Sequence, residues 1–289
     1  MANLRQLPPS TTALRDALLP PFIGGLIYLS VWCIVGYCAR EIAFRLPELE
    51  VWRALISAQG VFWAALLWLS RADLVWAVRK RGAIAYFLVV LLALVMSTLG
   101  PRIFSSLVSV FPDFTLLSPG VTWFALVFTT IGALVAAGLA MIIGAGFLEL
   151  RTTQPSFEQL TALRTRFRRC STSLSVVLVV AVTSTSWLSK AMEKIATGGY
   201  PREIVFSYGI YLTTLLLLVY LPASAEFYRA AVWLADETLP MKEFDKDLAE
   251  ARKAFLEELG ITAGDAFQGA LATLGPIVTA VVAVALGKE

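Results

Sequence analysis

Six long apolar stretches constrain this chain more than any other feature of its sequence. Each carries few or no charges, and each approaches or exceeds the length that crosses about 30 Å of hydrocarbon. Hydrophobic residues make up 58% of the 289 positions and the mean hydropathy is +0.74, well above ordinary globular proteins. We therefore expect an all-α integral membrane protein with about six transmembrane helices. They are predicted at residues 22–39, 52–70, 83–100, 121–148, 174–189 and 204–222.

The basic residues of the loops predict the orientation of these spans. Lys and Arg collect on the cytoplasmic side of membrane proteins. They are concentrated before the first span, after the second and after the fourth, so we expect the N-terminus in the cytoplasm. Six spans return the chain there, which divides it into a transmembrane domain, 1–222, and a cytoplasmic helical tail, 223–289. The basic residues are Arg5, Arg15, Arg71, Arg79, Lys80, Arg81, Arg151, Arg164, Arg166, Arg168 and Arg169.

The tail is expected to form two helices. Apolar residues recur at intervals of three and four over 238–260, which predicts an amphipathic helix that begins near Asp236, Glu237 and Thr238. A second helix is expected over 262–286, with a kink or break at Gly275-Pro276. The residues assigned to gating or oligomerisation are Phe244, Leu248, Phe255, Leu274, Pro276 and Ile277.

The last apolar run, 269–286, has eighteen uncharged residues and is long enough to cross a membrane. Seven of them are Gly or Ala, which suits close contact between helices better than contact with lipid. We favour a cytoplasmic helix buried in a homo-oligomer over a seventh span and over an interfacial or re-entrant helix. A cytoplasmic position would make self-association through the tail nearly obligatory.

The fifth span carries a row of hydroxyl side chains. On a helix, residues three and four apart share one face, and such a face could line a water-filled pore. The alternative is that the hydroxyl groups bond to carbonyl groups of their own helix or join neighbouring helices. The candidate pore-lining residues are Thr172, Ser175, Val179, Thr183, Ser186 and Lys190.

Other spans carry small or polar residues. Gly132, Ala136, Ala140 and Gly144 form a ridge of small residues in the fourth span and predict helix packing. Gln59 in the second span is expected to form a hydrogen bond across helices.

No Asp, Glu, Lys or Arg lies deep in a predicted span, which argues against an ion-coupled transporter but less against a passive pore.

Two basic clusters are candidate ligand sites, because guanidinium groups match phosphate oxygens in geometry. The alternative is orientation of the spans together with contact to the headgroups of anionic membrane lipids. The second cluster has Phe157 and Phe167 nearby for stacking on a base. The clusters are Arg79, Lys80 and Arg81, and Arg164, Arg166, Arg168 and Arg169.

Enzymatic chemistry is not expected. The chain has no histidine, which excludes imidazole haem ligation, the usual zinc sets and histidine acid-base catalysis. It also has no phosphate-binding loop motif, paired intramembrane carboxylates or CxxC pair, so no metal or cofactor is predicted. Its three cysteines, Cys33, Cys38 and Cys170, form no paired extracellular pattern.

The layout of six spans followed by the tail helices 238–260 and 262–286 resembles the Hailong-type channel effectors of bacterial antiphage defence. In that family, interlocking cytoplasmic C-terminal helices hold an oligomeric ion channel shut, and a DNA oligomer keeps the effector inhibited. The resemblance implies a bacterial inner (cytoplasmic) membrane location, a homo-oligomer with a tetramer favoured, and a nucleotide or single-stranded DNA ligand. The alternative functions are a structural or assembly subunit of a larger membrane complex and, with least support, a facilitator or lipid-handling protein.

Overall fold

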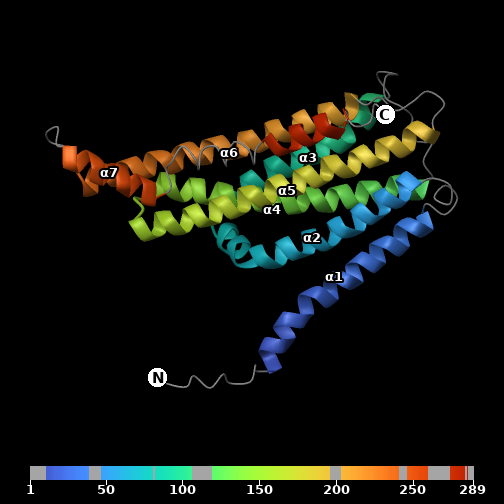
Figure 1. Ribbon diagram of the computed structural model, residues 1–289, viewed down its shortest axis with the longest axis horizontal. Coiled ribbons are helices and arrows are strands. Elements are labelled where there is room, and N and C mark those ends of the chain that lie inside the picture. The colour runs from blue at the N-terminus through green and yellow to red at the C-terminus, as the bar shows by residue number, and fades with distance from the viewer. Residues whose placement is uncertain are drawn as a thin grey trace.

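The apolar stretches of the sequence are long helices in the computed structural model of the protein (Figure 1). The structure describes residues 11–38, 47–80, 82–105, 119–195, 203–240, 246–259, 274–283 and 285. All regular elements in these ranges are helical, as the sequence predicts. The helices are α1 Thr11–Cys38, α2 Pro47–Val78, α3 Ala83–Ser105, α4 Pro119–Thr152, α5 Phe157–Ile195, α6 Glu203–Thr238, α7 Lys246–Glu258 and a C-terminal helix, Leu274–Ala283.

Four helices in the described part of the chain are long and apolar enough to cross a membrane. They are formed by Pro47–Val78, Val127–Thr152, Phe157–Ala191 and Val205–Thr238. The other two predicted spans fall on α1 and α3, whose described apolar parts, Ile23–Val35 and Ala83–Leu94, are shorter. The protein is therefore a helical bundle with membrane-spanning character, and the number of six spans stays a prediction.

Helix α4 lies at the centre of the bundle and contacts α1, α2, α3, α5 and α6. Small side chains allow this close packing: a Cβ on Gly132 would lie 2.5 Å from the Trp63 ring of α2, and one on Gly144 would overlap the Tyr86 ring of α3. Between these glycines, Ala136 and Ala140 are almost fully buried. All four residues of the predicted ridge thus lie in contacts between helices.

The outer faces of the bundle expose large apolar side chains. Leu29 of α1, Val89 of α3 and Leu218 of α6 are 59%, 67% and 70% exposed. In water such surfaces would favour aggregation, whereas hydrocarbon solvates them without penalty. These faces suit contact with lipid chains.

Helix α6 extends beyond the predicted end of the sixth span. It continues through Pro222 to Thr238, so the expected domain boundary at 222 falls inside one helix. Asp236, Glu237 and Thr238 lie in its last turn and do not begin the tail helix, which corrects that prediction. Pro240 explains the end of α6, because proline disfavours helical conformation in the residue before it.

The extension of α6 is stabilised by a second apolar cluster at that end of the bundle. Ala230 and Ala231 of α6 are buried with Leu160 of α5 and Leu259, the residue after α7. Phe255 of α7 is partly buried against the same cluster. The apolar face of the amphipathic tail helix α7 is therefore at least partly covered within its own chain.

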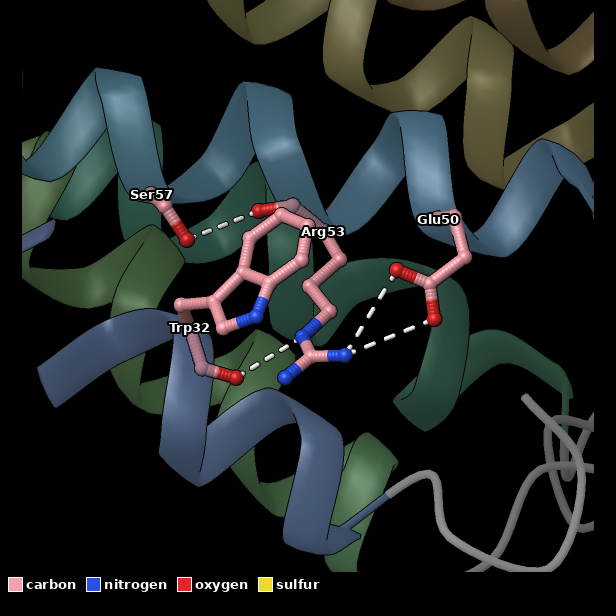
Figure 2. A network of polar contacts seen from close by, with 4 residues as sticks. All are labelled: Trp32, Glu50, Arg53 and Ser57. Carbon is pink, nitrogen blue, oxygen red and sulfur yellow. Dashed lines mark hydrogen bonds and ion pairs between the residues drawn. The ribbon is translucent and has the colours of Figure 1, made fainter. Parts of the chain in front are cut away.

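Helices α1 and α2 are joined near the opposite end of the bundle by Arg53 (Figure 2). Its Nε donates a hydrogen bond of 2.8 Å to the carbonyl oxygen of Trp32, and its guanidinium lies 4.0 Å from the Trp32 ring centre. Glu50 accepts from Nη1 at 3.4 Å, while Ser57 donates to the Arg53 carbonyl oxygen. One arginine thus fixes the position of α1 on α2 at this level.

Candidate functional site

The C-terminal helix packs against α5 and α6, beside the membrane-spanning helices. A Cβ added to Gly209 of α6 would overlap Ala280 and lie 3.0 Å from the Pro276 carbonyl oxygen. A Cβ on Gly275 would lie 3.0 Å from Val179 Cγ2 and 3.1 Å from Ser175 Oγ of α5. The backbones approach closely at both positions because the glycines have no side chain.

The sequence predicts a cytoplasmic helix covered by other copies of the chain, and both the side of the membrane and the cover by other copies stay predictions. The Gly and Ala content does indicate close helix contact, but the contact lies inside the same chain. In Figure 1 the C-terminal helix lies along α6, away from α7. Pro276 is buried within the described part of this helix, Leu274–Ala283, and the residues before Leu274 that bear on the expected kink lie outside the described ranges.

The hydroxyl stripe of α5 lies partly beneath this helix. Ser175 and Ser186 are 6% and 8% exposed, and Val179 is partly buried. Thr183 Oγ1 donates to the Val179 carbonyl oxygen at 2.9 Å, as the alternative interpretation of the stripe expects. The two ends of the stripe lie elsewhere: Thr172 is exposed, and the Lys190 ammonium lies 4.9 Å from the centre of the Trp187 ring.

Comparison with known proteins adds no family to this geometry. No family model, no curated protein and no solved structure matches the chain. The functional interpretation therefore depends on the contacts themselves.

A cavity of about 100 Å³, lined mostly by apolar side chains with a few polar groups, lies inside the bundle and is bounded chiefly by α2, α4 and α5. Ser184 Oγ donates a hydrogen bond of 3.0 Å to Gln59 Oε1 at its wall, in agreement with the interhelical bond expected for Gln59. Trp63 also lines the cavity, and its buried Nε1 donor has no hydrogen-bond partner among the described residues. The space and the donors suit enclosed water.

The residues assigned to gating lie in two separate places. Phe255 packs against Phe157 of α5 with the rings tilted by 48° and 5.4 Å between ring centres, and Leu248 is partly buried on α7. In the C-terminal helix, Pro276 is buried and Ile277 partly buried, while Leu274 is 43% exposed. Phe244 lies outside the described residues. The structure therefore does not join these residues in one unit.

The second arginine cluster is divided between two faces of α5. Arg166 Nε lies 3.2 Å from Asp73 Oδ1 of α2 and its guanidinium 4.8 Å from the centre of the Trp76 ring. Arg169 also forms an ion pair with Asp73, which is only 7% exposed. Arg164 and Arg168 line a neighbouring open hollow between α2 and α5, and Arg169 contributes to both places.

The first basic cluster is not one binding surface either. The Lys80 ammonium lies 2.9 Å from Glu149 Oε2 of α4, so its charge is already paired. Arg79 is exposed, and Arg81 lies outside the described residues. Gly82 follows with a φ of 93°, a conformation that favours glycine and makes the tight connection from α2 to α3.

Two residues that shape the site were not singled out from the sequence. Gly209 is a single glycine in an apolar run, and nothing in the run indicates which helix it meets. Asp73 is the only acid near the basic end of α2, between Arg71 and Arg79, which is a usable signal for an ion pair. Within the described ranges, no three Cys, Asp or Glu residues come together as a metal site.

Proposed function

We propose that the protein is a transmembrane channel in which the C-terminal helix covers the conducting face of α5 and holds it closed. The observation that carries the proposal is the contact of Gly275 with Ser175 and Val179. Two features that are far apart in the sequence, the hydroxyl stripe and the tail, lie against each other there. A face with hydroxyl groups can be hydrated once the covering helix leaves it, whereas a purely apolar face would stay dry.

The contacts of the covering helix support a reversible closure. They are made by small residues, Gly209 with Ala280 and Gly275 with Ser175, and the described part of this helix, Leu274–Ala283, has no charged side chain that could form an ion pair. Such contacts depend on shape alone, so a modest displacement removes most of their energy. Gating depends on an element that can occupy two discrete positions, and a helix held by such contacts is an element of this kind.

The wider role of the channel follows from the resemblance to Hailong-type effectors. We propose a homo-oligomeric effector of antiphage defence in the bacterial inner membrane, regulated by a nucleotide or a DNA oligomer. These parts of the proposal depend on the architecture of six spans and a helical tail. The closed position of the C-terminal helix depends on the contacts above and can be tested separately.

The test is ion flux through liposomes that contain the purified full-length protein. Gly209→Leu and Gly275→Leu each force a side chain into the contact, which costs about 1–3 kcal/mol. We expect each to raise the flux by about 5- to 150-fold, because the open population increases by that factor. Gly25→Leu is the matched control, since a Cβ at Gly25 meets nothing within 4 Å.

A reversible crosslink distinguishes opening from general leakiness. Val179→Cys with Gly275→Cys, in a background without the native cysteines, places two thiols across the contact. Oxidation should close the channel in the Gly209→Leu protein, and reduction should open it again. If Gly209→Leu and a truncation after residue 273 both insert normally and conduct no more than the wild type, the proposal is wrong and a structural subunit becomes the better assignment.

A further inference from the structure

An open hollow of about 590 Å³ lies between α2 and α5, on the outside of the bundle near the beginning of α5. Its volume is within the range of small-molecule sites, about 300–1,000 Å³. Three guanidinium groups line it, those of Arg164, Arg168 and Arg169, and none of the described residues that line it is acidic. Guanidinium groups therefore gather at one end of the hollow, and one of them, that of Arg169, is paired with Asp73 of α2.

The chemistry of the lining changes along α5. The arginines come first, hydroxyl side chains of Thr172 and Ser173 follow, and Val176 comes last. From Arg164 to Val176 the helix rises about 18 Å, at 1.5 Å per residue. Opposite them, α2 contributes Phe62. One end of the hollow is thus cationic and the other apolar, with hydroxyl groups between them.

The change from cationic to apolar lining along the hollow matches the position that the sequence predicts for α5 in the membrane. The fifth apolar stretch is predicted to begin at residue 174, which places Val176 at the edge of the hydrocarbon and Arg168 and Arg169 about 8–9 Å outside it, near the headgroups. Arg164 lies about 15 Å outside the hydrocarbon, so its long side chain has to reach toward the headgroups. A soluble anion would use only the cationic end. A phospholipid has an anionic headgroup, a polar glycerol and ester region, and apolar chains in the same order.

Two of these arginines are oriented by contacts with other helices. Arg169 forms an ion pair with Asp73 of α2, and Arg164 Nη1 lies 3.4 Å from the carbonyl oxygen of Glu258 at the end of α7. A cation is favoured near the carbonyl groups that end a helix. The site is thus built from three helices and is more than a row of surface charges.

We propose that this hollow binds the headgroup of an anionic phospholipid, with the phosphate between Arg164 and Arg168 and one acyl chain along Phe62, Leu66 and Val176. Charge complementarity and the apolar end of the hollow select this occupant. The residues that line the hollow are not those of the contact between Gly275 and Ser175 and Val179, so the lipid proposal can fail while the closed position of the C-terminal helix stands.

The test compares retention of phosphatidylglycerol and phosphatidylcholine with identical acyl chains, measured by native mass spectrometry on the full-length protein. We expect the wild type to retain phosphatidylglycerol in preference. The double variant Arg164→Gln, Arg168→Gln should lower its retention about 25-fold, because each arginine near an anionic lipid contributes about fivefold. Arg79→Gln removes an exposed arginine at the same end of the bundle and should change retention less than about twofold.

A second variant keeps the charge and changes the shape. Thr172→Phe fills the middle of the hollow at an exposed position and should also reduce retention. Inorganic phosphate should not displace the lipid, since it lacks the acyl chain. The proposal is overturned if the two lipids are retained equally, if the double variant retains as much as the wild type, or if phosphate or a single-stranded oligonucleotide displaces the lipid.

Discussion

Helices α4 and α5 pack against each other in the middle of the bundle, yet they bury different kinds of side chain. Helix α4 buries Ala, Leu, Ile and Val over most of its surface, and no buried polar residue of the described chain belongs to it. Helix α5 buries five serines together with its apolar residues. They are Ser171, Ser175, Ser184, Ser186 and Ser189.

This difference indicates how each helix can behave. A face of small apolar residues is stable only while other helices cover it closely, because its energy comes from packing. A face with hydroxyl groups can exchange a helix for water at lower cost, because each hydroxyl can bond to water or to its own helix. We therefore regard α4 as the fixed centre of the bundle and α5 as the helix whose cover can change.

The largest effect should come from filling a contact of α4. Gly144→Leu would drive its side chain into the Tyr86 ring of α3, where even a Cβ overlaps. We expect the free energy of unfolding in detergent to fall by about 3 kcal/mol, the upper part of the range for overpacking. Gly25→Leu, on the open side of α1, should change it little.

A compensating change sharpens this prediction. Tyr86→Ala removes the ring that Gly144→Leu strikes, so the two changes together should destabilise less than the sum of each alone. If Gly144→Leu unfolds at the wild-type concentration of denaturant, α4 is not the rigid centre that its burial indicates.

A smaller effect is expected at the ion pairs that join α5 to α2. Asp73→Asn removes the carboxylate between Arg166 and Arg169. Asp73 is nearly buried but both arginines are partly exposed, so we expect a loss of about 1–2 kcal/mol in the free energy of unfolding. Glu257→Gln, which affects only an exposed pair with Lys253, is the control and should change it by less than about 0.5 kcal/mol.

High salt separates charge from packing in this variant. The difference between Asp73→Asn and the wild type should shrink in 1 M salt, since screening over about 3 Å weakens the partly exposed pairs. A difference that does not depend on salt would mean that Asp73 acts through its hydrogen bonds or its shape. The Asp73 ion pairs would then no longer support the contrast between a polar α5 and an apolar α4.

The smallest effect should appear at the buried hydrogen bond between α2 and α5. A double-mutant cycle with Gln59→Leu and Ser184→Ala should give a coupling of about 0.6 kcal/mol, typical of polar contacts between membrane helices. The measurement is unfolding of the four proteins under one condition. A coupling near zero would show that water in the adjoining cavity replaces the bond, and that α5 is hydrated even in the closed form.

The sequence predicted the helices better than it predicted their contacts. Apolar runs identify helices of membrane length because hydrocarbon leaves few alternatives for the backbone. The end of α6 was missed, because the apolar residues that extend it are interleaved with charged ones and are buried only by α5 and α7. Pro222 also resembled a helix end, although the helix continues through it.

The candidate site was predicted in its parts but not in its assembly. The hydroxyl stripe and the small residues of the tail are readable in the sequence, yet only the position of Gly209 and Gly275 joins them. A short helix rich in Gly and Ala has the same pattern whether it packs within its own chain or between copies. Within the arginine cluster, Arg166 pairs with Asp73 whereas Arg164 and Arg168 line the outer hollow. The spacing of the arginines does not predict this, because it does not show which side of α5 faces α2.

The attachment of α1 at Arg53 has a mechanical consequence. The hydrogen bond to Trp32 holds α1 near its C-terminal end, and Figure 1 shows the helix diverging from the bundle toward its other end. Gly24 of α1 packs closely against Val61 of α2, so the part of α1 that can tilt runs from Gly24 back to Thr11. That part measures about 20 Å, and a tilt of about 10° carries Thr11 about 3 Å. Helix α1 is therefore held on α2 from Gly24 to Trp32, and changes in the thickness or tension of the surrounding bilayer would move its first turns most.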